Sequence, residues 1–255
     1  MSDTISTTRR GGVVEVRFDR GEHNAVDARM VAELNEVLGE IAGDDSAQVV
    51  VLTGAGRSFC PGADLSTAPD ASDVADDLRA ADYGATVLLH EMPQLTVAAV
   101  NGACAGAGMA WAAACDLRIA SSRARFNMAF LQVGVAGDMG GAWTLPRLLG
   151  GARARDLFYL AGKFDAHEAE RIGFVSRVLA EEDFMGAVYS LLEPVIRSEP
   201  EALRMMKANF LAAERMDLAD YVELETERHL GLFRGAKGRR TRELLSEQGR
   251  SVHRG

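Results

Sequence analysis

Residues 96–110 read TVAAVNGACAGAGMA, and this stretch decides the fold class. Its first five residues are apolar except for one threonine, as is typical of a strand buried on both faces in a parallel sheet. Residues 101–110, called the second loop below, are mostly Gly, Ala and Cys, which are small enough to bring bare backbone close to a ligand. A helix is predicted to begin in this loop and to run to about Ala114. The order of strand, loop and helix is the building unit of α/β folds.

The same order appears upstream. Residues 48–53, QVVVLT, form another nearly all-apolar strand, and residues 58–65, SFCPGADL, form another small-residue segment, called the first loop. Residues 13–18, VVEVRF, alternate in the manner of a strand. Asp27 is the predicted N-cap of a helix that runs to about Ala42 with its apolar side chains on one stripe. This alternation predicts an α/β fold.

Further elements are predicted downstream. Strands are expected over residues 117–120 and 174–179, and a helix over residues 142–149. Residues 165–168, DAHE, and residues 198–201, SEPE, each fit a capping box that opens a helix. After the second box the pattern is helical to the end of the chain.

We therefore expect a core over residues 1–195 and a helical C-terminal region over residues 196–255. Residues 66–82 are rich in Ala, Asp and Ser and are expected to form a surface connection. A helix is expected over about residues 74–92.

Composition limits the function classes. The 255 residues carry a formal net charge of -9, which argues against a nucleic-acid partner. The three cysteines form no C-x-x-C pair, and the five histidines show no metal-binding spacing, so we expect reduced thiols, no metal and a cytoplasmic location. The N-terminus lacks a signal-peptide pattern, and no run of about 18 apolar residues exists, so no membrane association is expected.

The two loops point to backbone chemistry. Amides at the start of a helix lack intrahelical acceptors, so they are suited to hold a developing oxyanion. One alternative is that both loops are tight turns packed in a core. Another is a dinucleotide-binding loop, because G-x-G motifs occupy residues 54–56 and 106–108. The third glycine of that motif is missing, since Phe59 and Trp111 stand in its place.

Taken together, the motifs resemble those of the crotonase (enoyl-CoA hydratase/isomerase) superfamily, in collinear order over about residues 11–245. The segments that carry the resemblance are residues 19–38 (DRGEHNAVDARMVAELNEVL), 49–65 (VVVLTGAGRSFCPGADL), 96–121 (TVAAVNGACAGAGMAWAAACDLRIAS), 134–150 (GVAGDMGGAWTLPRLLG) and 165–179 (DAHEAERIGFVSRVL).

This resemblance implies a spiral of ββα units with a C-terminal helical region that assembles trimers, often paired into hexamers. It implies an acyl-CoA thioester as substrate, with coenzyme A as part of that substrate and no other cofactor. It also implies that the amides of Ala63 and Ala107 polarise the thioester carbonyl and stabilise an enolate. Many relatives have Gly where Ala107 stands, and Ala offers the same N–H provided that φ is not positive there.

Two departures from the family pattern bear on the reaction. The family's hydratases carry glutamates at the positions that match Ala110 and Phe130, and neither residue here can move a proton. Asp138 remains, and the resemblance implies that some isomerases place a catalytic aspartate there. Burial beside Phe130, Val133 and Met139 is expected to raise the pKa of Asp138. The alternative for Asp138 is a loop aspartate that bonds nearby backbone amides.

We therefore expect an enoyl-CoA isomerase with Asp138 as acid and base. The alternatives are a hydratase with an unusual acid or base, an aryl-CoA dehalogenase with Asp138 as nucleophile, and a non-catalytic acyl-CoA-binding protein. Asp64 is expected to hold the first loop. The resemblance also implies that Phe233 and Lys237 touch CoA, either that of their own subunit or that of a neighbouring one. The expected substrate-binding residues are Ala25, Arg57, Ala63, Asp64, Leu65, Gly106, Ala107, Phe130, Val133, Phe233 and Lys237.

Overall fold

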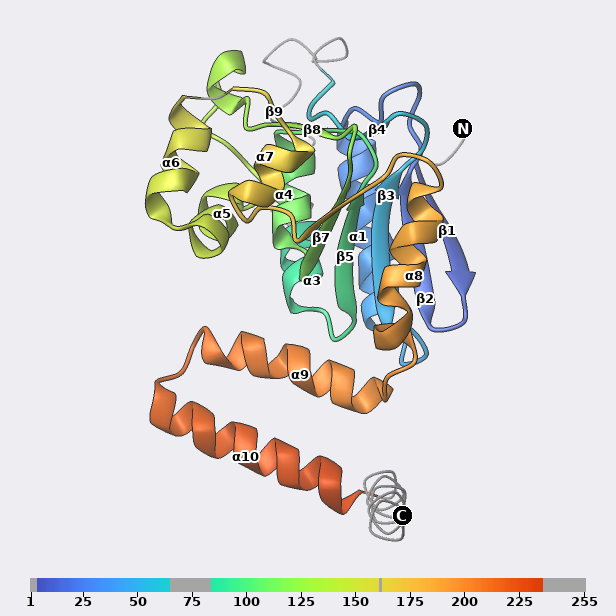
Figure 1. Ribbon diagram of the computed structural model, residues 1–255, viewed down its shortest axis with the longest axis vertical. Coiled ribbons are helices and arrows are strands. Elements are labelled where there is room, and N and C mark those ends of the chain that lie inside the picture. The colour runs from blue at the N-terminus through green and yellow to red at the C-terminus, as the bar shows by residue number, and fades with distance from the viewer. Residues whose placement is uncertain (1–3, 65–83, 161, 236–255) are drawn as a thin grey trace, which may run out of the picture. The chain divides into compact units, whose positions relative to one another are not determined.

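The computed structural model describes residues 4–64, 84–160 and 162–235 (Figure 1). By its internal contacts the chain falls into two compact units, Met1–Arg197 and Ser198–Gly255. Leu65 and Lys237, and the whole of the surface connection expected over residues 66–82, lie outside the described residues.

A six-stranded sheet forms the centre of the first unit, in the order β1-β2-β3-β5-β7-β10. All neighbouring strands are parallel except β1 and β2. The strands predicted from the sequence are confirmed, except that the one expected over residues 174–179 begins only at Arg177. The edge strand β1 was not predicted, because five of its six residues are exposed and its polar sequence lacks a buried face. The strands are β1 (Ile5–Arg10), β2 (Val13–Phe18), β3 (Val49–Gly54), β5 (Leu95–Val100), β7 (Leu117–Ser121) and β10 (Arg177–Leu179).

A second, smaller sheet corrects the interpretation of both loops. Its order is β4-β6-β8-β9, and its strands are β4 (Ser58–Cys60), β6 (Ala103–Ala105), β8 (Arg125–Asn127) and β9 (Phe164–Asp165). The first and second loops therefore each contain a three-residue strand, which is too short to show alternation in the sequence. Because β4 and β6 pair in parallel, the two loops lie side by side.

The helices of the first unit are largely those predicted, with α6 and α8 as additions. Helix α4 is buried at every residue, which explains why its sequence is apolar on all sides. The described part of the predicted helix over residues 74–92 is α3. The elements are α1 (Ala28–Ala42), α3 (Ala85–Glu91), α4 (Ala107–Ala114), the 3-10 helix η2 (Phe130–Val133), α5 (Gly141–Leu149), α6 (Gly151–Tyr159), α7 (Ala166–Arg171) and α8 (Phe184–Ile196).

Helix caps test the local predictions directly. The Asp27 carboxylate accepts from the Met30 amide at 2.8 Å, and the Asp165 carboxylate accepts from the Glu168 amide at 2.8 Å, so both predicted caps are confirmed. The capping box at residues 198–201 is wrong. Helix α9 (Pro200–Ala213) has Glu199 as its N-cap, and the Glu199 side chain makes no capping hydrogen bond.

An aromatic cluster joins the large sheet, the small sheet and α4. The ring of Phe18 on β2 stacks against Trp111 of α4 at 5.6 Å and meets the ring of Phe59 on β4 edge-on at 5.2 Å. All three side chains are fully buried. This packing fixes β4 and α4, which carry the two loops, to the central sheet.

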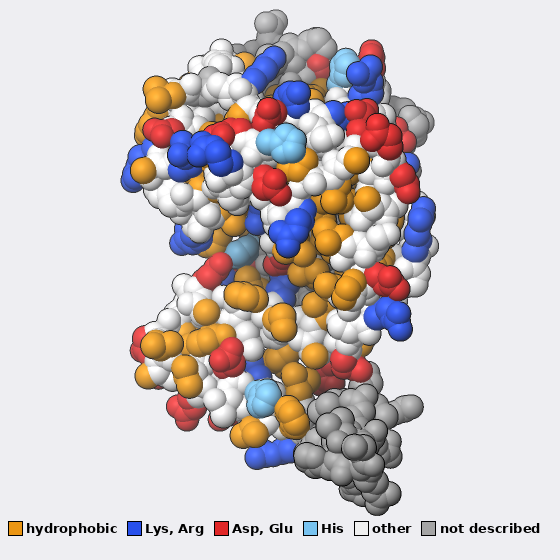
Figure 2. All heavy atoms as spheres, in the orientation of Figure 1, with side chains coloured by type: hydrophobic (Ala, Val, Ile, Leu, Met, Phe, Trp, Pro, Cys, Tyr) orange, Lys and Arg blue, Asp and Glu red, His pale blue; other side chains and the backbone are white. Residues whose placement is uncertain are grey.

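The second unit consists of α9 and α10 (Leu218–Arg234) in its described part, with Asp217 capping α10. The Arg228 guanidinium donates to Asn209 Oδ1 at 2.8 Å and links the two helices. Figure 2 shows hydrophobic side chains on the surface of these helices. Phe210 and Leu218 are among the exposed large hydrophobic residues of the described chain. Assembly through this region stays a prediction. Within the described ranges, no helix has the length and apolar character needed to cross a bilayer.

Candidate active site

The first loop presents the amide of Ala63. The Val26 amide donates to Gly62 O at 2.8 Å, and the Asp64 amide donates to Val26 O at 2.9 Å, which makes a one-residue parallel bridge. In this pairing the residue between the two bonds, Ala63, directs its own N–H elsewhere. That N–H donates to no acceptor among the described residues, and Ala63 is exposed.

The second loop presents the amide of Ala107, which is the first residue of α4. Its N–H therefore has no intrahelical acceptor, and no other described residue accepts it. The positive φ of this turn falls on Gly106 at 49°, so Ala107 keeps an ordinary backbone. Alanine is thus tolerated here, and the positive end of the helix dipole adds to the amide's ability to hold negative charge.

Close backbone approach brings the two loops together. A Cβ on Gly108 would lie 2.2 Å from Cys60 O, and a Cβ on Gly106 would lie 3.7 Å from the Gly62 Cα. Only residues without a side chain permit the contact at Gly108, which explains the run of small residues in both loops. The sequence prediction that bare backbone gathers here is confirmed.

Asp138 lies three residues before α5, in a turn where Gly137, Met139 and Gly140 all have positive φ. Thr86 of α3 holds this turn, because its hydroxyl donates to Met139 O at 3.1 Å. A non-glycine residue at positive φ is uncommon, so the conformation at Met139 depends on such contacts. Asp138 makes no side-chain hydrogen bond to any other residue in the described part of the chain.

The Cys60 thiol lies between the two loops and within electrostatic reach of Asp138. The backbone N–H groups of Gly62 and Gly108 point at the Cys60 sulfur, one from each loop. Burial raises the pKa of the Cys60 thiol to about 12, and the negative charge of Asp138 adds to this rise. An electrostatic effect of this kind requires a carboxylate close to the thiol that both loops enclose.

Desolvation also raises the pKa of the Asp138 carboxyl itself, while its own backbone amide opposes this shift. As a whole residue Asp138 is exposed, so the carboxyl remains reachable from outside even though protein surrounds part of it. A carboxylate that is accessible and poorly solvated is a stronger base than an ordinary aspartate.

Apolar groups fill the positions where the family's hydratases carry acids. Ala110 is fully buried, and Phe130 is only 7% exposed. The Phe130 ring stacks on Phe158 at 6.2 Å. It also lies 3.8 Å from where a Cβ on Gly106 would be and 3.6 Å from that of Gly137. Phe130 therefore packs between the second loop and the Asp138 turn.

Of the other predicted site residues, some lie beside the two loops and others do not. Ala25 is half-buried and adjoins the first loop through the Val26 bridge. Arg57 is exposed directly before the first loop. Val133 is 46% exposed at the end of η2, so it does not join the buried apolar shell that was expected around Asp138. Phe233 lies on α10 of the second unit, 40% exposed, and its contact with CoA stays a prediction.

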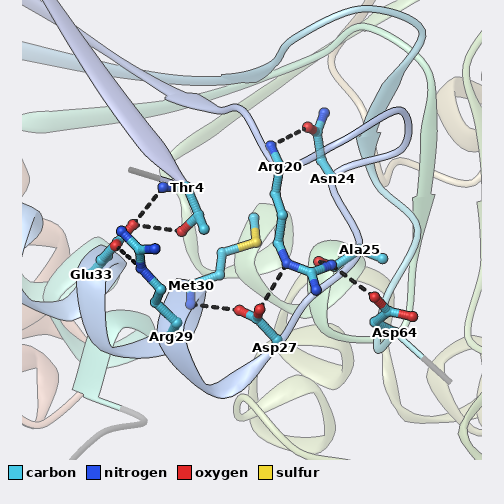
Figure 3. Close-up of polar contacts among 9 residues, drawn as sticks. All are labelled: Thr4, Arg20, Asn24, Ala25, Asp27, Arg29, Met30, Glu33 and Asp64. Atoms are coloured by element: carbon cyan, nitrogen blue, oxygen red, sulfur yellow. Dashed lines mark hydrogen bonds and ion pairs between the residues drawn. The ribbon is translucent and has the colours of Figure 1, made fainter. Parts of the chain in front are cut away.

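Sequence reasoning missed two polar residues that hold the loops. The Asn101 side chain pairs with both backbone groups of Gly54, at 3.1 and 2.9 Å, and so ties the second loop to the end of β3. The Arg20 guanidinium donates to Asp64 at 2.9 Å and to Asp27 at 2.8 Å (Figure 3). The sequence separation is 47 residues for Asn101 and Gly54, 44 for Arg20 and Asp64, and 7 for Arg20 and Asp27. No local sequence pattern predicts these contacts.

A separate hollow of about 510 Å³ lies at the start of α6, lined by residues that include Gly150, Arg153 and Arg171. It shares no residue with either loop or with Asp138. Arg171 is already paired with Glu168 at 2.6 Å. We assign no role in the chemistry to this hollow.

The fold, with two amides on adjacent loops that are unpaired among the described residues and an aspartate in a neighbouring turn, is typical of a class of enzymes that process acyl-CoA thioesters. The chain belongs to the enoyl-CoA hydratase/isomerase (crotonase) family: the family model with that description matches residues 8–252.

Curated relatives differ in their reactions. A carnitinyl-CoA dehydratase of Proteus mirabilis is 31% identical over 88% of this chain and 86% of its own length. A 1,2-epoxyphenylacetyl-CoA isomerase of Escherichia coli is 34% identical over 89% of each chain. A 4-chlorobenzoyl coenzyme A dehalogenase of Arthrobacter is 36% identical over 72% of this chain and 69% of its own length.

Solved structures agree on the fold. An enoyl-CoA hydratase of Bacillus anthracis superposes with a TM-score of 0.88 at 26% identity, covering 96% of both chains. A Thermobifida fusca protein in complex with CoA superposes with a TM-score of 0.82 at 28% identity, covering 96% of this chain and 95% of its own. The chain is therefore an acyl-CoA-processing enzyme of the crotonase family.

Proposed function

We propose that the enzyme moves a carbon–carbon double bond within an acyl-CoA thioester. The Asp138 carboxylate removes a proton from the α carbon of a 3-enoyl-CoA, and the electrons move onto the thioester oxygen to form a dienolate. The amides of Ala63 and Ala107 hold that oxygen. Asp138 then returns the proton to the γ carbon, so that the product is the conjugated 2-enoyl-CoA and the enzyme is unchanged.

The observation that carries this proposal is that Asp64 and Asp138 differ in their bonding partners. Asp64 is bound by Arg20 at 2.9 Å, so its charge is already compensated. Asp138 bonds only its own backbone amide within the described residues, and its pKa is raised. An uncompensated carboxylate next to two unused amides has the features required of a base that forms an enolate.

Hydration requires more than this arrangement supplies. Water must be both positioned and deprotonated, and the family's hydratases divide this task between two glutamates. Ala110 and Phe130 hold those positions here, and both side chains are buried and apolar. A single carboxylate suffices for proton transfer between two carbons of one substrate.

The test compares Asp138→Asn with the wild type on a 3-enoyl-CoA, with the 2-enoyl product followed by absorbance. Loss of the base is expected to lower kcat by about 10²-fold or more. NMR in deuterated water should show deuterium at the α and γ carbons with wild type and not with Asp138→Asn. Asp156→Asn, the same change at an exposed site on α6, is the matched control and should behave as wild type. Equal turnover by Asp138→Asn would refute the proposal.

A second candidate is nucleophilic displacement on an aryl-CoA. The dehalogenase relative and the aromatic Phe130 beside the Asp138 turn favour it. In that reaction an Asp138 oxygen attacks the halogenated ring carbon, halide leaves, and water cleaves the resulting aryl ester. Halide release from a 4-halobenzoyl-CoA, with a trapped ester on Asp138, would establish this reaction in place of isomerisation.

The dehydratase relatives suggest a third possible reaction, which the same measurements distinguish from the first two. Addition of water to a 2-enoyl-CoA by wild type, without exchange at the γ carbon, would indicate hydratase chemistry with Asp138 as an unusual acid or base. Tight binding of acyl-CoA with neither exchange nor turnover would indicate a binding protein.

A further inference from the structure

Arg20 sits at the centre of a polar network that reaches from the N-terminal turn to the first loop (Figure 3). Its Nε donates to Asp27 at 2.8 Å, and its Nη1 donates both to Asp64 at 2.9 Å and to the carbonyl of Ala25 at 2.8 Å. One guanidinium thus binds the N-cap of α1, the chain beside it and the residue that follows Ala63.

The same N-terminal turn holds the rest of the first loop through its backbone. The buried Asn24 side chain donates to Ala55 O at 3.0 Å and to Ser58 O at 2.9 Å. Asn24 itself is kept in place at φ 59° because its side-chain oxygen accepts from the Arg20 amide at 3.0 Å. Val26 then forms the bridge on either side of Ala63. The direction of the Ala63 N–H therefore depends on the turn that Arg20 organises.

Charge makes Arg20 the member of this network that is hardest to replace. The Arg20 and Asp64 side chains are only 21% and 17% exposed, so little water is available to substitute for their ion pair. Without the guanidinium, the carboxylates of Asp27 and Asp64 lose the cation that both of them bind. Repulsion and renewed hydration would draw Asp64 away, and Ala63 is covalently attached to it.

We propose that Arg20 is a positioning residue that sets the direction of the Ala63 amide by holding Asp64 and Ala25. This inference rests on the proposed function, since it concerns the amide that polarises the thioester carbonyl. Arg20 does not touch the substrate in this role. Its effect is expected on the reaction's transition state, because an amide displaced by a fraction of an ångström loses much of its hold on an oxyanion.

The test uses the full-length enzyme and three variants. Arg20→Met removes the charge and keeps much of the length. Arg20→Lys restores a charge, but one ammonium group cannot reproduce the planar fork that serves Asp27 and Asp64 together. Arg29→Met is the matched control. It breaks an ion pair at 2.5 Å between Arg29 and Glu33, two residues of α1.

The first readout is the division between kcat and KM. Arg20→Met is expected to lower kcat on the order of 10- to 100-fold while KM changes by less than about threefold, because an oxyanion contact strengthens in the transition state. Arg20→Lys should recover part of the loss, and Arg29→Met should match wild type. A thermal melt of each variant identifies any loss of folding, and if Arg20→Met fails to fold, Arg20→Lys alone carries the comparison.

The second readout is the infrared stretching frequency of the thioester carbonyl. Infrared difference spectra of bound butyryl-CoA labelled with ¹³C at the carbonyl report how strongly the amides polarise it. A shift to lower frequency is expected in wild type and in Arg29→Met, with a smaller shift in the Arg20 variants. An equal shift in all folded variants would overturn the role of Arg20 and leave the proposed function standing. The absence of any shift in wild type would overturn the proposed function itself, and the inference with it.

Discussion

The carboxyl of Asp138 derives its chemistry from what surrounds it. Desolvation raises its pKa, and its partner within the described residues is its own amide alone. The proton-accepting form is therefore lost at a higher pH than the value of about 3.9 for an ordinary aspartate. Activity should fall as the pH is lowered through this raised pKa, since protonation removes the base.

A pH profile of kcat/KM for isomerisation tests this at the residue scale. The profile reports groups in the free enzyme, so its acid limb should lie above the range of an ordinary aspartate. The residual rate of Asp138→Asn should lack that limb, and Asp156→Asn should retain it. An acid limb at the ordinary value would mean that the carboxyl is fully solvated in solution.

Gly108 and Gly39 differ in what surrounds an added methyl group. A Cβ on Gly108 would lie 2.2 Å from Cys60 O, so Gly108→Ala must push the two loops apart and is expected to cost about 3 kcal/mol. A Cβ on Gly39 in α1 meets nothing within 4 Å, so Gly39→Ala is expected to stabilise by about 0.5–1 kcal/mol. Urea unfolding measures both, and a neutral Gly108→Ala would contradict the close contact.

Elements were predictable where their own sequence carries the signal. The buried strand β3 is a continuous apolar run, and α1 combines an apolar stripe with its Asp27 cap, so both were found. The strands β4 and β6 were not predicted because three residues cannot show a period. They are defined by their pairing with each other, which the local sequence does not indicate. The prediction of a capping box before α9 was wrong. Pro200 suits the first helical position, so the N-cap is Glu199.

Helix α8 is attached to the sheet by a buried charge. Glu15 on β2 is 2% exposed, and it accepts from the Tyr189 hydroxyl at 2.6 Å and from Arg17. Tyr189→Phe leaves that carboxylate with one partner fewer, and a hydrogen bond to a charged group contributes about 1.5–3 kcal/mol. We expect a loss of stability of that order by urea unfolding.

Tyr221→Phe is the control at the same scale. Its hydroxyl donates to Glu225 at 2.8 Å on the surface of α10, where water replaces the lost bond. It should leave stability almost unchanged. Equal effects of the two substitutions would show that Glu15 is hydrated through some opening and that Tyr189 does not anchor α8.

At the scale of the molecule, the candidate site joins segments that are remote in the sequence. The resemblance to a family located Ala63, Ala107 and Asp138, and the structure brings the Asp138 turn to the loops through Phe130 and Cys60. The Arg20 network was not predictable, because its bond to Asp64 joins residues that are 44 positions apart in the sequence. Local patterns indicate elements, and the polar contacts between elements depend on tertiary geometry.

The second unit exposes large apolar side chains on both of its described helices. Phe210 on α9 is 72% exposed and Leu218 on α10 is 77% exposed. Exposed hydrophobic side chains of this size are typical of surfaces that subunits cover. We expect sedimentation at micromolar concentration to give three or six chains per particle, and Phe210→Glu to release smaller species by placing a charge in the contact. Leu160→Glu, equally exposed at 78% but in the first unit, is the control and should leave the assembly intact. A wild type that sediments as one chain would refute assembly through these helices. The site that contains the Ala63 amide would then be built by one chain alone.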